Sequence, residues 1–237
     1  MISKINEVEK FNTKKFNELK TEKYWIAAQD TFVNNSDLGK TVHPQFLYSE
    51  VEKCGGMHND ICLAVGTRVM LRRNLDTPNG LVSGSMGTVE GFMWPILARR
   101  PRENGQLPDS VIIRFDDPDI ALKMQNLSTS NGCIKIEPYS VVFQGKKGKT
   151  ISRHMLPLIH CWAVTIHKMQ STTLNKAVVD LDCFGQGLEY VALSRVKTME
   201  GLAVSRIATR RFFKNTIVCK DSLKELGIEF KALENEK

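Results

Sequence analysis

The stretch that most constrains the fold of this chain runs from residue 153 to residue 204. An apolar run of helix-forming composition follows Pro157, and it predicts a helix over residues 157–170. The stretch then predicts a strand, a second helix and a second strand, at 177–181, 188–196 and 202–204. Such an alternation of helices and strands is typical of an α/β layer built on a parallel sheet.

The spacing within the first helix predicts two faces. Trp162, Ile166 and Met169 fall at helical intervals, and we expect them to pack inward. A second face collects polar side chains, namely His160, His167 and Ser171. Ligands of parallel sheets bind beyond the carboxyl ends of the strands. The groups predicted near such junctions are Lys168, Gln170 and Arg195, which offer charge and hydrogen bonds to phosphates.

The rest of the chain has a different character. Residues 1–23 predict an amphipathic helix, residues 24–28 a strand, and the polar segment 31–57 a loop with a short helix at 44–50. Four short β-rich runs follow, which we expect to close into a small barrel; they are 68–71, 87–92, 111–115 and 134–137. The glycines among them lack a following helix, so they predict turns and bulges rather than a dinucleotide site; they are Gly80, Gly84, Gly87 and Gly91.

Charge is concentrated in one part of the sequence. The net charge is +7, and residues 140–215 hold 12 Lys/Arg against 4 Asp/Glu. This concentration indicates a polyanion partner such as nucleic acid, and a merely solvated basic face is the alternative. The six cysteines are scattered without a C-x-x-C pair, which predicts free thiols in a reducing compartment and no metal site. No apolar run approaches the roughly 20 residues that span a membrane.

The segment 145–150, GKKGKT, ends like a phosphate-binding loop. The pattern G-x-x-x-x-G-K-[ST] needs glycine at position 143, and Phe143 stands there. We therefore interpret the segment as the flexible return from the expected barrel, with three lysines that favour phosphates.

Three segments resemble motifs of one family. AVTIHKMQSTTL, EYVALSRVKTMEGL and SRHMLPL are similar to motifs of the petite-integration-frequency (Pif) helicases, which are close to the RecD and Helitron helicases. AVGTRVMLRRNLDTPNGLVSGSMGTVEGF is similar to the family segment that forms a Src-homology-type barrel. The resemblance covers roughly residues 5–208 and implies the second RecA-like motor domain with this barrel inserted. The first part of the motor domain with a linker is expected at residues 1–57, the inserted barrel at 58–148, and the remainder of the motor domain at 149–237.

The resemblance also implies roles for single residues. Arg195 would be an arginine finger toward the γ-phosphate of ATP, with an ordinary surface ion pair as the alternative. Other nucleotide contacts would come from Gln170, Ser171, Tyr190 and Arg153, and single-stranded DNA would lie on Thr165, His167 and Lys168. A structural histidine at 167 and a packing role for Tyr190 are alternatives. For Asn12 and Asp30 we expect caps of a helix and a strand rather than ligand contacts.

The family hydrolyses ATP with Mg²⁺ between two motor domains, and this sequence contains no P-loop. We therefore expect half of an ATP-dependent 5′-to-3′ DNA helicase, inactive alone, nuclear or cytoplasmic, and paired with an N-terminal motor domain. The resemblance places such enzymes in DNA repair, recombination and telomere maintenance. The alternatives are a nucleic-acid-binding module without ATPase activity and, more remotely, a protein-interaction barrel.

Overall fold

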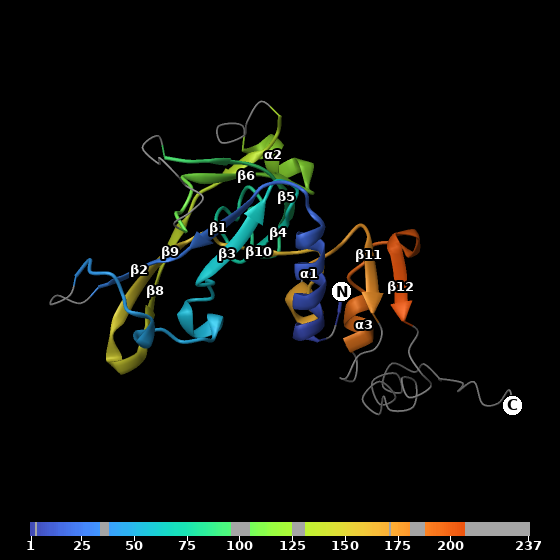
Figure 1. Ribbon diagram of the computed structural model, residues 1–237. Helices are drawn as coiled ribbons and strands as arrows, with labels where there is room; N and C mark the ends of the chain where they lie inside the picture. The colour runs from blue at the N-terminus through green and yellow to red at the C-terminus, as the bar shows by residue number, and fades with distance from the viewer. Residues whose placement is uncertain are drawn as a thin grey trace, which may run out of the picture. The chain divides into compact units, whose positions relative to one another are not determined.

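The computed structural model describes residues 1–2, 4–33, 38–95, 105–124, 131–170, 172–180 and 188–206. The chain forms two compact units, each described here by itself (Figure 1). The sheet unit is Lys10–Trp162, and the motif unit is Met1–Glu9 with Ala163–Lys237. Both domain boundaries expected from the sequence, after residues 57 and 148, fall inside the sheet unit.

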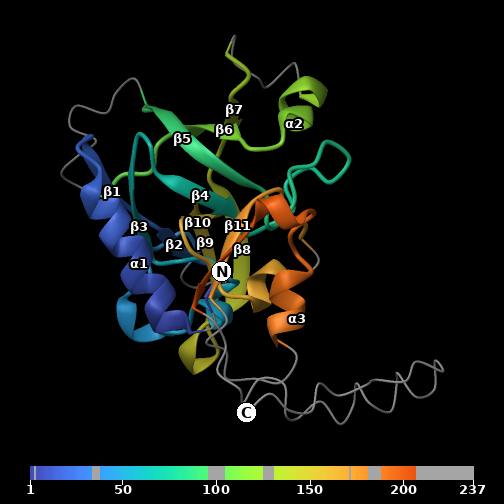
Figure 2. The same ribbon diagram turned by 90° about the vertical axis from the view of Figure 1, so that its right-hand side faces the viewer.

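A five-stranded antiparallel sheet dominates the sheet unit, in the order β10-β4-β5-β6-β7 (Figures 1 and 2). Its strands are β4 (Arg68–Leu71), β5 (Met86–Met93), β6 (Ser110–Phe115), β7 (Ile134–Ile136) and β10 (Leu158–His160). Four of them were predicted, because β-branched residues there alternate or cluster between turn residues. Helix α2 (Pro118–Lys123) lies against β6, and the Asp117 carboxylate caps its start by accepting from the Asp119 amide.

The predicted closed barrel is wrong for the described residues. The outer strands β7 and β10 do not pair with each other, so the five-stranded sheet stays open. Both are only three residues long, which limits how many ladder hydrogen bonds a closure could form. The next strand along the chain, β8 (Tyr139–Gln144), instead joins β9 (Thr150–Met155) and β2 (Gln29–Phe32) in a separate antiparallel sheet.

The start of the chain follows its prediction only in part. Helix α1 covers Ile5–Glu18 and buries Phe16 of the expected apolar face, whereas Ile5 and Phe11 of that face are exposed. Strand β1 (Lys23–Ala27) also forms, but it pairs antiparallel with β3 (Asp60–Ala64) and not in a parallel sheet. The polar segment that follows contains two short 3-10 turns, η1 (Pro44–Phe46) and η2 (Val51–Cys54).

The helix predicted over residues 157–170 is wrong. Leu158, Ile159 and His160 form β10 and pair with Leu71, Met70 and Val69 of β4. A short buried apolar run does not by itself distinguish strand from helix, and here the distant pairing decides. His160 therefore lies in a strand, whereas His167 lies in the exposed turn η4 (His167–Met169), so the predicted polar face does not form.

The motif unit holds the parallel pairing that the sequence predicts. Strand β11 (Ala177–Asp180) pairs in parallel with β12 (Leu202–Arg206), and helix α3 (Leu188–Leu193) connects them. All other strand pairs among the described residues are antiparallel. The fold is thus a mixed α/β arrangement with several small sheets. No helix in the described ranges is long and apolar enough to cross a membrane.

His160 is a partly buried titratable group in the sheet unit. Its Nε2–H donates to the Cys62 carbonyl at 2.7 Å, and its ring stacks on Phe16 with centroids 4.9 Å apart. Burial lowers the pKa of His160 below its ordinary value of 6.5, and the hydrogen bond to Cys62 opposes this only in part. The folded state therefore keeps this imidazole neutral at a pH where the unfolded chain already binds a proton.

We expect the sheet unit to lose stability as the pH falls below about 6.5. The unfolded state then binds more protons than the folded state, with a slope of at most about 1.4 kcal/mol per pH unit for one group. Urea midpoints followed by tryptophan fluorescence measure this, because Trp25, Trp94 and Trp162 all lie in the sheet unit. In His160→Gln the free energy of unfolding should no longer depend on pH between about pH 6.5 and 5. If the pH dependence persists in this variant, another group causes it.

Candidate nucleotide and nucleic-acid site

The turn η4 presents polar side chains from a buried support. Ile166 and Met169 are fully buried, while His167, Lys168 and Gln170 are exposed. The backbone before the turn pairs with the start of the chain, since the Ile2 amide donates to Val164 and the Ile166 amide donates to Ile2. Apolar anchors on both sides therefore hold the turn and leave its polar groups accessible.

Thr165 differs from the other predicted DNA contacts. It bridges Ile2 in parallel register and is only 7% exposed. Its position supports the turn rather than offering a hydroxyl to solvent. Ser171, predicted at the nucleotide, lies outside the described residues.

Arg195 follows the end of α3 and is half-buried. Its Nε donates to the Val191 carbonyl at 3.1 Å, and its Nη2 donates to Ser194 Oγ at 3.1 Å. Within the described ranges no carboxylate pairs with this guanidinium, so the surface ion pair considered from the sequence is not formed there. Both of its partners are local, which orients the side chain and leaves donors for a ligand.

Backbone hydrogen bonds join the two motifs. The Leu174 amide donates to the Arg195 carbonyl at 2.7 Å, and the Lys197 amide donates back to Leu174 at 3.0 Å. Leu174 and Val196 thereby form a parallel bridge ahead of the β11–β12 pair. The segment leaving η4 and the segment leaving α3 are therefore held side by side, and Arg195 has a fixed place relative to this strand entry.

Tyr190 lies on α3 and is 75% exposed. The packing role considered for it from the sequence is therefore not seen among the described residues, and its ring is accessible to a ligand.

A close approach at Gly201 supports this junction. A Cβ at Gly201 would lie 2.0 Å from the Asn175 carbonyl oxygen and 3.3 Å from Val196 Cγ1. The first distance is far below any real contact, and the obstacle is backbone, so no side-chain movement relieves it. Glycine is required at 201 because a side chain has no space there. Its backbone conformation is not the reason, since its φ lies outside the left-handed region.

Gly201→Ala is expected to separate the segment around Leu174 from the segment around Val196. The free energy that holds the two segments together should fall by about 1–3 kcal/mol. Hydrogen exchange of the Leu174 and Lys197 amides should then accelerate on the order of 10- to 100-fold. Gly91→Ala is the matched control, because a Cβ there meets only Ile112 Cδ1 at 3.6 Å. Unchanged protection of both amides in Gly201→Ala would contradict this packing.

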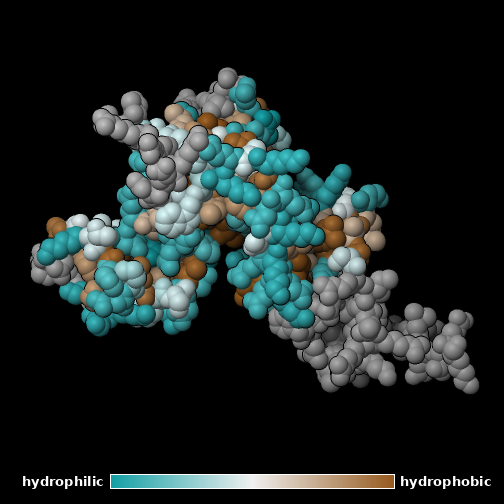
Figure 3. Space-filling view, in the orientation of Figure 1, coloured by the Kyte–Doolittle hydropathy of each residue, from teal (hydrophilic) through white to brown (hydrophobic). Residues whose placement is uncertain are grey.

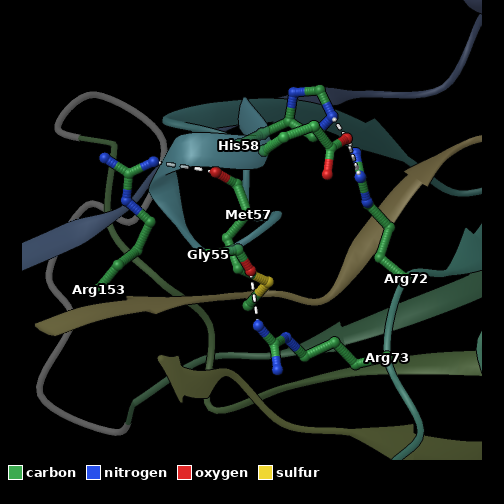
Figure 4. Close-up of polar contacts among 7 residues, drawn as sticks. Gly55, Met57, His58, Arg72, Arg73 and Arg153 are labelled. Atoms are coloured by element: carbon green, nitrogen blue, oxygen red, sulfur yellow. Dashed lines mark hydrogen bonds and ion pairs between the residues drawn. The ribbon is translucent and has the colours of Figure 1, made fainter. Parts of the chain in front are cut away.

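Arg153 belongs to the sheet unit and is fully buried, and Figure 4 shows its contact with Met57. Its Nε and Nη2 donate to the two carboxylate oxygens of Asp30, each at 2.7 Å, and its Nη1 donates to the Met57 carbonyl at 2.9 Å. The residue is 0% exposed and its guanidinium lies 5.4 Å from the centre of the Phe143 ring. A guanidinium with these partners cannot reach a nucleotide without leaving them, so we assign Arg153 a structural role in place of the predicted nucleotide contact.

The sequence-based interpretation missed the partner of Arg153. Asp30 is directly opposite Arg153 in the β2–β9 ladder, and it is not the strand cap expected from the sequence. Asn12 is likewise no helix cap: it is buried inside α1 and its Nδ2 donates to the His160 carbonyl at 3.4 Å. Two further arginines hold the same turn region as Arg153 (Figure 4): Arg72 pairs with Glu52 at 2.8 Å, and Arg73 donates to the Gly55 carbonyl at 2.6 Å.

The GKKGKT segment is a hairpin connection between two paired strands, and not the flexible return from a barrel that the sequence suggested. It joins β8 to β9 through the 3-10 turn η3 (Lys146–Gly148), and no long helix follows it. A second GKT, at residues 39–41, has Asn34 where a P-loop needs glycine. No group of three or more potential metal ligands occurs among the described residues.

Comparisons with known proteins identify relatives. No protein-family model matches the chain. The ATP-dependent DNA helicase PIF1 of Xenopus laevis is 33% identical over 200 residues, which are 84% of this chain and 26% of that protein. Human PIF1 is 31% identical over 194 residues, 81% of this chain and 25% of that protein. The chain thus spans about a quarter of the length of the curated relatives it matches.

Solved structures agree with this relationship. The Pif1 helicase of Candida albicans superposes with a TM-score of 0.66 and 25% identity, over 95% of this chain and 49% of that chain. A Bacteroides Pif1 bound to single-stranded DNA gives a TM-score of 0.57 and 25% identity, over 95% of this chain and 44% of that chain. In sequence and in fold, the chain is Pif1-like and is similar to a part of the Pif1 DNA helicases.

Proposed function

We propose that this chain is the C-terminal motor portion of an ATP-dependent 5′-to-3′ DNA helicase. In this role it binds single-stranded DNA and supplies Arg195 to ATP held by a separate P-loop domain. The relatives named above are ATP-dependent DNA helicases, and one solved relative is bound to single-stranded DNA. The second RecA-like domain expected from the sequence is part of this proposal, whereas the closed barrel is not, because the described five-stranded sheet is open.

The observation that carries the proposal is the state of Arg195. Its guanidinium is oriented by Val191 and Ser194, is half-buried, and has no carboxylate partner in the described part of the chain. A fixed, unneutralised guanidinium suits a phosphate, because its planar fork matches phosphate oxygens bidentately. Gln170 and Tyr190 are exposed in the same unit and are proposed as further nucleotide contacts.

For the DNA side, His167 and Lys168 of η4 are proposed contacts. Both are exposed, and a lysine beside a histidine on a rigid turn can donate to phosphate oxygens. Thr165 is assigned the support of this turn, because its side chain is buried.

ATP bound with Mg²⁺ supplies the phosphoryl group and the metal charge in this chemistry. Arg195 fits one part of that requirement, the cationic donor, whereas the described residues include no group that could hold the metal, and the sequence has no P-loop to cradle the phosphates. Arg195 would hold its donors toward the charge that develops on the transferred phosphoryl oxygens. The cradle and the metal ligands are therefore assigned to the partner motor domain.

A nucleic-acid-binding module without ATPase activity is the second candidate. The concentration of basic residues in 140–215 favours it independently of Arg195, since phosphate contacts need only lysine and arginine. The two candidates differ in whether a P-loop domain restores hydrolysis.

The deciding experiment measures DNA-stimulated ATP hydrolysis by the chain alone, by a P-loop motor domain of a Pif1 relative alone, and by the two combined or fused. The helicase proposal expects hydrolysis well above either part only in the combination. If the combination never exceeds its parts while the chain still binds single strands, the binding-module candidate is correct.

A further inference from the structure

The hairpin between β8 and β9 carries a cluster of lysines in the sheet unit. Lys146 and Lys147 are exposed in the turn η3, and Lys149 follows it. Lys147 has φ 57°, the only positive φ of a described non-glycine residue. The turn thus holds its lysines on a defined backbone conformation, and they are not among the residues assigned to ATP or to DNA in the helicase proposal.

Aromatic rings lie beneath these lysines. The Lys146 and Lys53 ammonium groups lie 5.7 and 5.3 Å from the centre of the Tyr48 ring. Lys147 lies 5.5 Å from the ring of Phe46, and Lys149 lies 5.7 Å from the ring of Phe32. Phe32 and Phe46 contact each other edge to face at 5.5 Å, and Tyr48 follows Phe46 by two residues in the chain. We call these seven residues the lysine platform: Phe32, Phe46, Tyr48, Lys53, Lys146, Lys147 and Lys149.

The platform is packed and not merely a flexible turn. A Cβ at Gly145 would lie 2.8 Å from the Phe46 carbonyl oxygen and 2.4 Å from Ile151 Cδ1, so the hairpin backbone is pressed against η1. Cation–π contacts restrict where each ammonium can go. In the space-filling view, hydrophilic and hydrophobic residues interleave over this end of the unit (Figure 3).

Positive charge on the platform is only partly neutralised. Lys53 pairs with Glu50 at 3.0 Å, whereas no carboxylate pairs with Lys146 or Lys147 among the described residues. Lysine is a point-charge donor without the planar fork that reads base edges. The platform therefore suits phosphate groups as anions and does not suit recognition of a base sequence.

We propose that the lysine platform is a second nucleic-acid contact, which binds the phosphate backbone without sequence preference. It lies on the sheet unit, whereas Lys168 and Arg195 belong to the motif unit. The lysine ammonium groups donate to successive phosphates, and Tyr48 and Phe46 keep them in place beneath. This contact is independent of ATP and of the helicase proposal, since it uses none of the same residues.

The test is the binding of the whole chain to a fluorescein-labelled oligothymidylate and to a duplex of equal length, between about 50 and 200 mM salt. The variant is Lys146→Gln/Lys147→Gly/Lys149→Gln, in which glycine keeps the positive φ of position 147. The matched control removes three exposed lysines elsewhere in the sheet unit, as Lys10→Gln/Lys123→Gln/Lys135→Gln. Lys168→Gln is measured in parallel.

The platform variant is expected to weaken binding of the single strand on the order of 100-fold at about 0.1 M salt, and to reduce the salt slope by about 2, since each lost phosphate contact contributes about 0.7. The control should change little. Equal losses in variant and control, or an unchanged salt slope, would overturn the proposal. If only Lys168→Gln loses affinity, the contact lies on the motif unit and the platform proposal is refuted. If only the platform variant loses affinity, the platform proposal is supported and Lys168 is not a contact. A larger loss with the duplex identifies double-stranded nucleic acid as the preferred source of the phosphates.

Discussion

Arg153→Met is expected to destabilise the sheet unit by about 3–5 kcal/mol. Arg153 and Asp30 are 0% and 9% exposed, and two hydrogen bonds of 2.7 Å join them. Removing the guanidinium leaves a buried carboxylate without its counter-ion and the Met57 carbonyl without a donor. Urea unfolding followed by tryptophan fluorescence measures the loss, because the three tryptophans lie in this unit.

Two variants make the result specific. Arg114→Met removes an ion pair of similar length, 2.9 Å to Glu90, whose side chains are 57% and 36% exposed. It should cost no more than about 1 kcal/mol, because solvent already screens that pair. Asp30→Leu/Arg153→Met should recover most of the stability, since both charges are then gone. A small effect of Arg153→Met, equal to that of Arg114→Met, would reopen the nucleotide-contact prediction for Arg153.

The elements that could be predicted from the sequence are those with a local cause. Apart from Arg114 and Asp180, residues 111–115 and 177–180 are β-branched or otherwise apolar, and both runs form strands. The parallel β11–β12 pair follows from two such runs separated by a helix. The error at residues 157–170 has a nonlocal cause, because β10 is specified by its pairing with β4 more than 80 residues earlier.

The candidate site also combines features with a local cause in the sequence and features that depend on distant strand pairing. The exposure of His167 and Lys168 on a turn follows from apolar neighbours that are buried on either side. The enclosure of Arg153 could not be predicted, because it depends on a register that sets it opposite Asp30, 123 residues away. An arginine that resembles a family motif can therefore be structural, and only the pairing of distant strands distinguishes the two roles.

Arg195→Ala is expected to lower the hydrolysis rate of the combined protein by about 10³-fold or more, equivalent to about 4 kcal/mol of transition-state stabilisation. The fold should survive, because the side chain of Arg195 is half-buried and its link to Leu174 uses the backbone carbonyl. Arg195→Lys should recover only a small part of the rate, since a point charge lacks the bidentate fork. The measurement is kcat for ATP in the presence of saturating single-stranded DNA, with the P-loop domain supplied.

Lys197→Ala is the matched control for Arg195→Ala. Lys197 is an exposed cation two residues away, and its link to Leu174 also runs through the backbone, so it tests for a general loss of positive charge. We expect its kcat to stay within a few-fold of the unaltered protein, and DNA binding by Arg195→Ala to stay intact. Because Arg195 acts only on the developing phosphoryl charge, the effect should fall on kcat and not on the DNA concentration needed for half-maximal stimulation. Equal losses in the two variants would mean that Arg195 contributes electrostatic attraction for DNA, and the chain would then be a binding surface rather than half of an ATPase site.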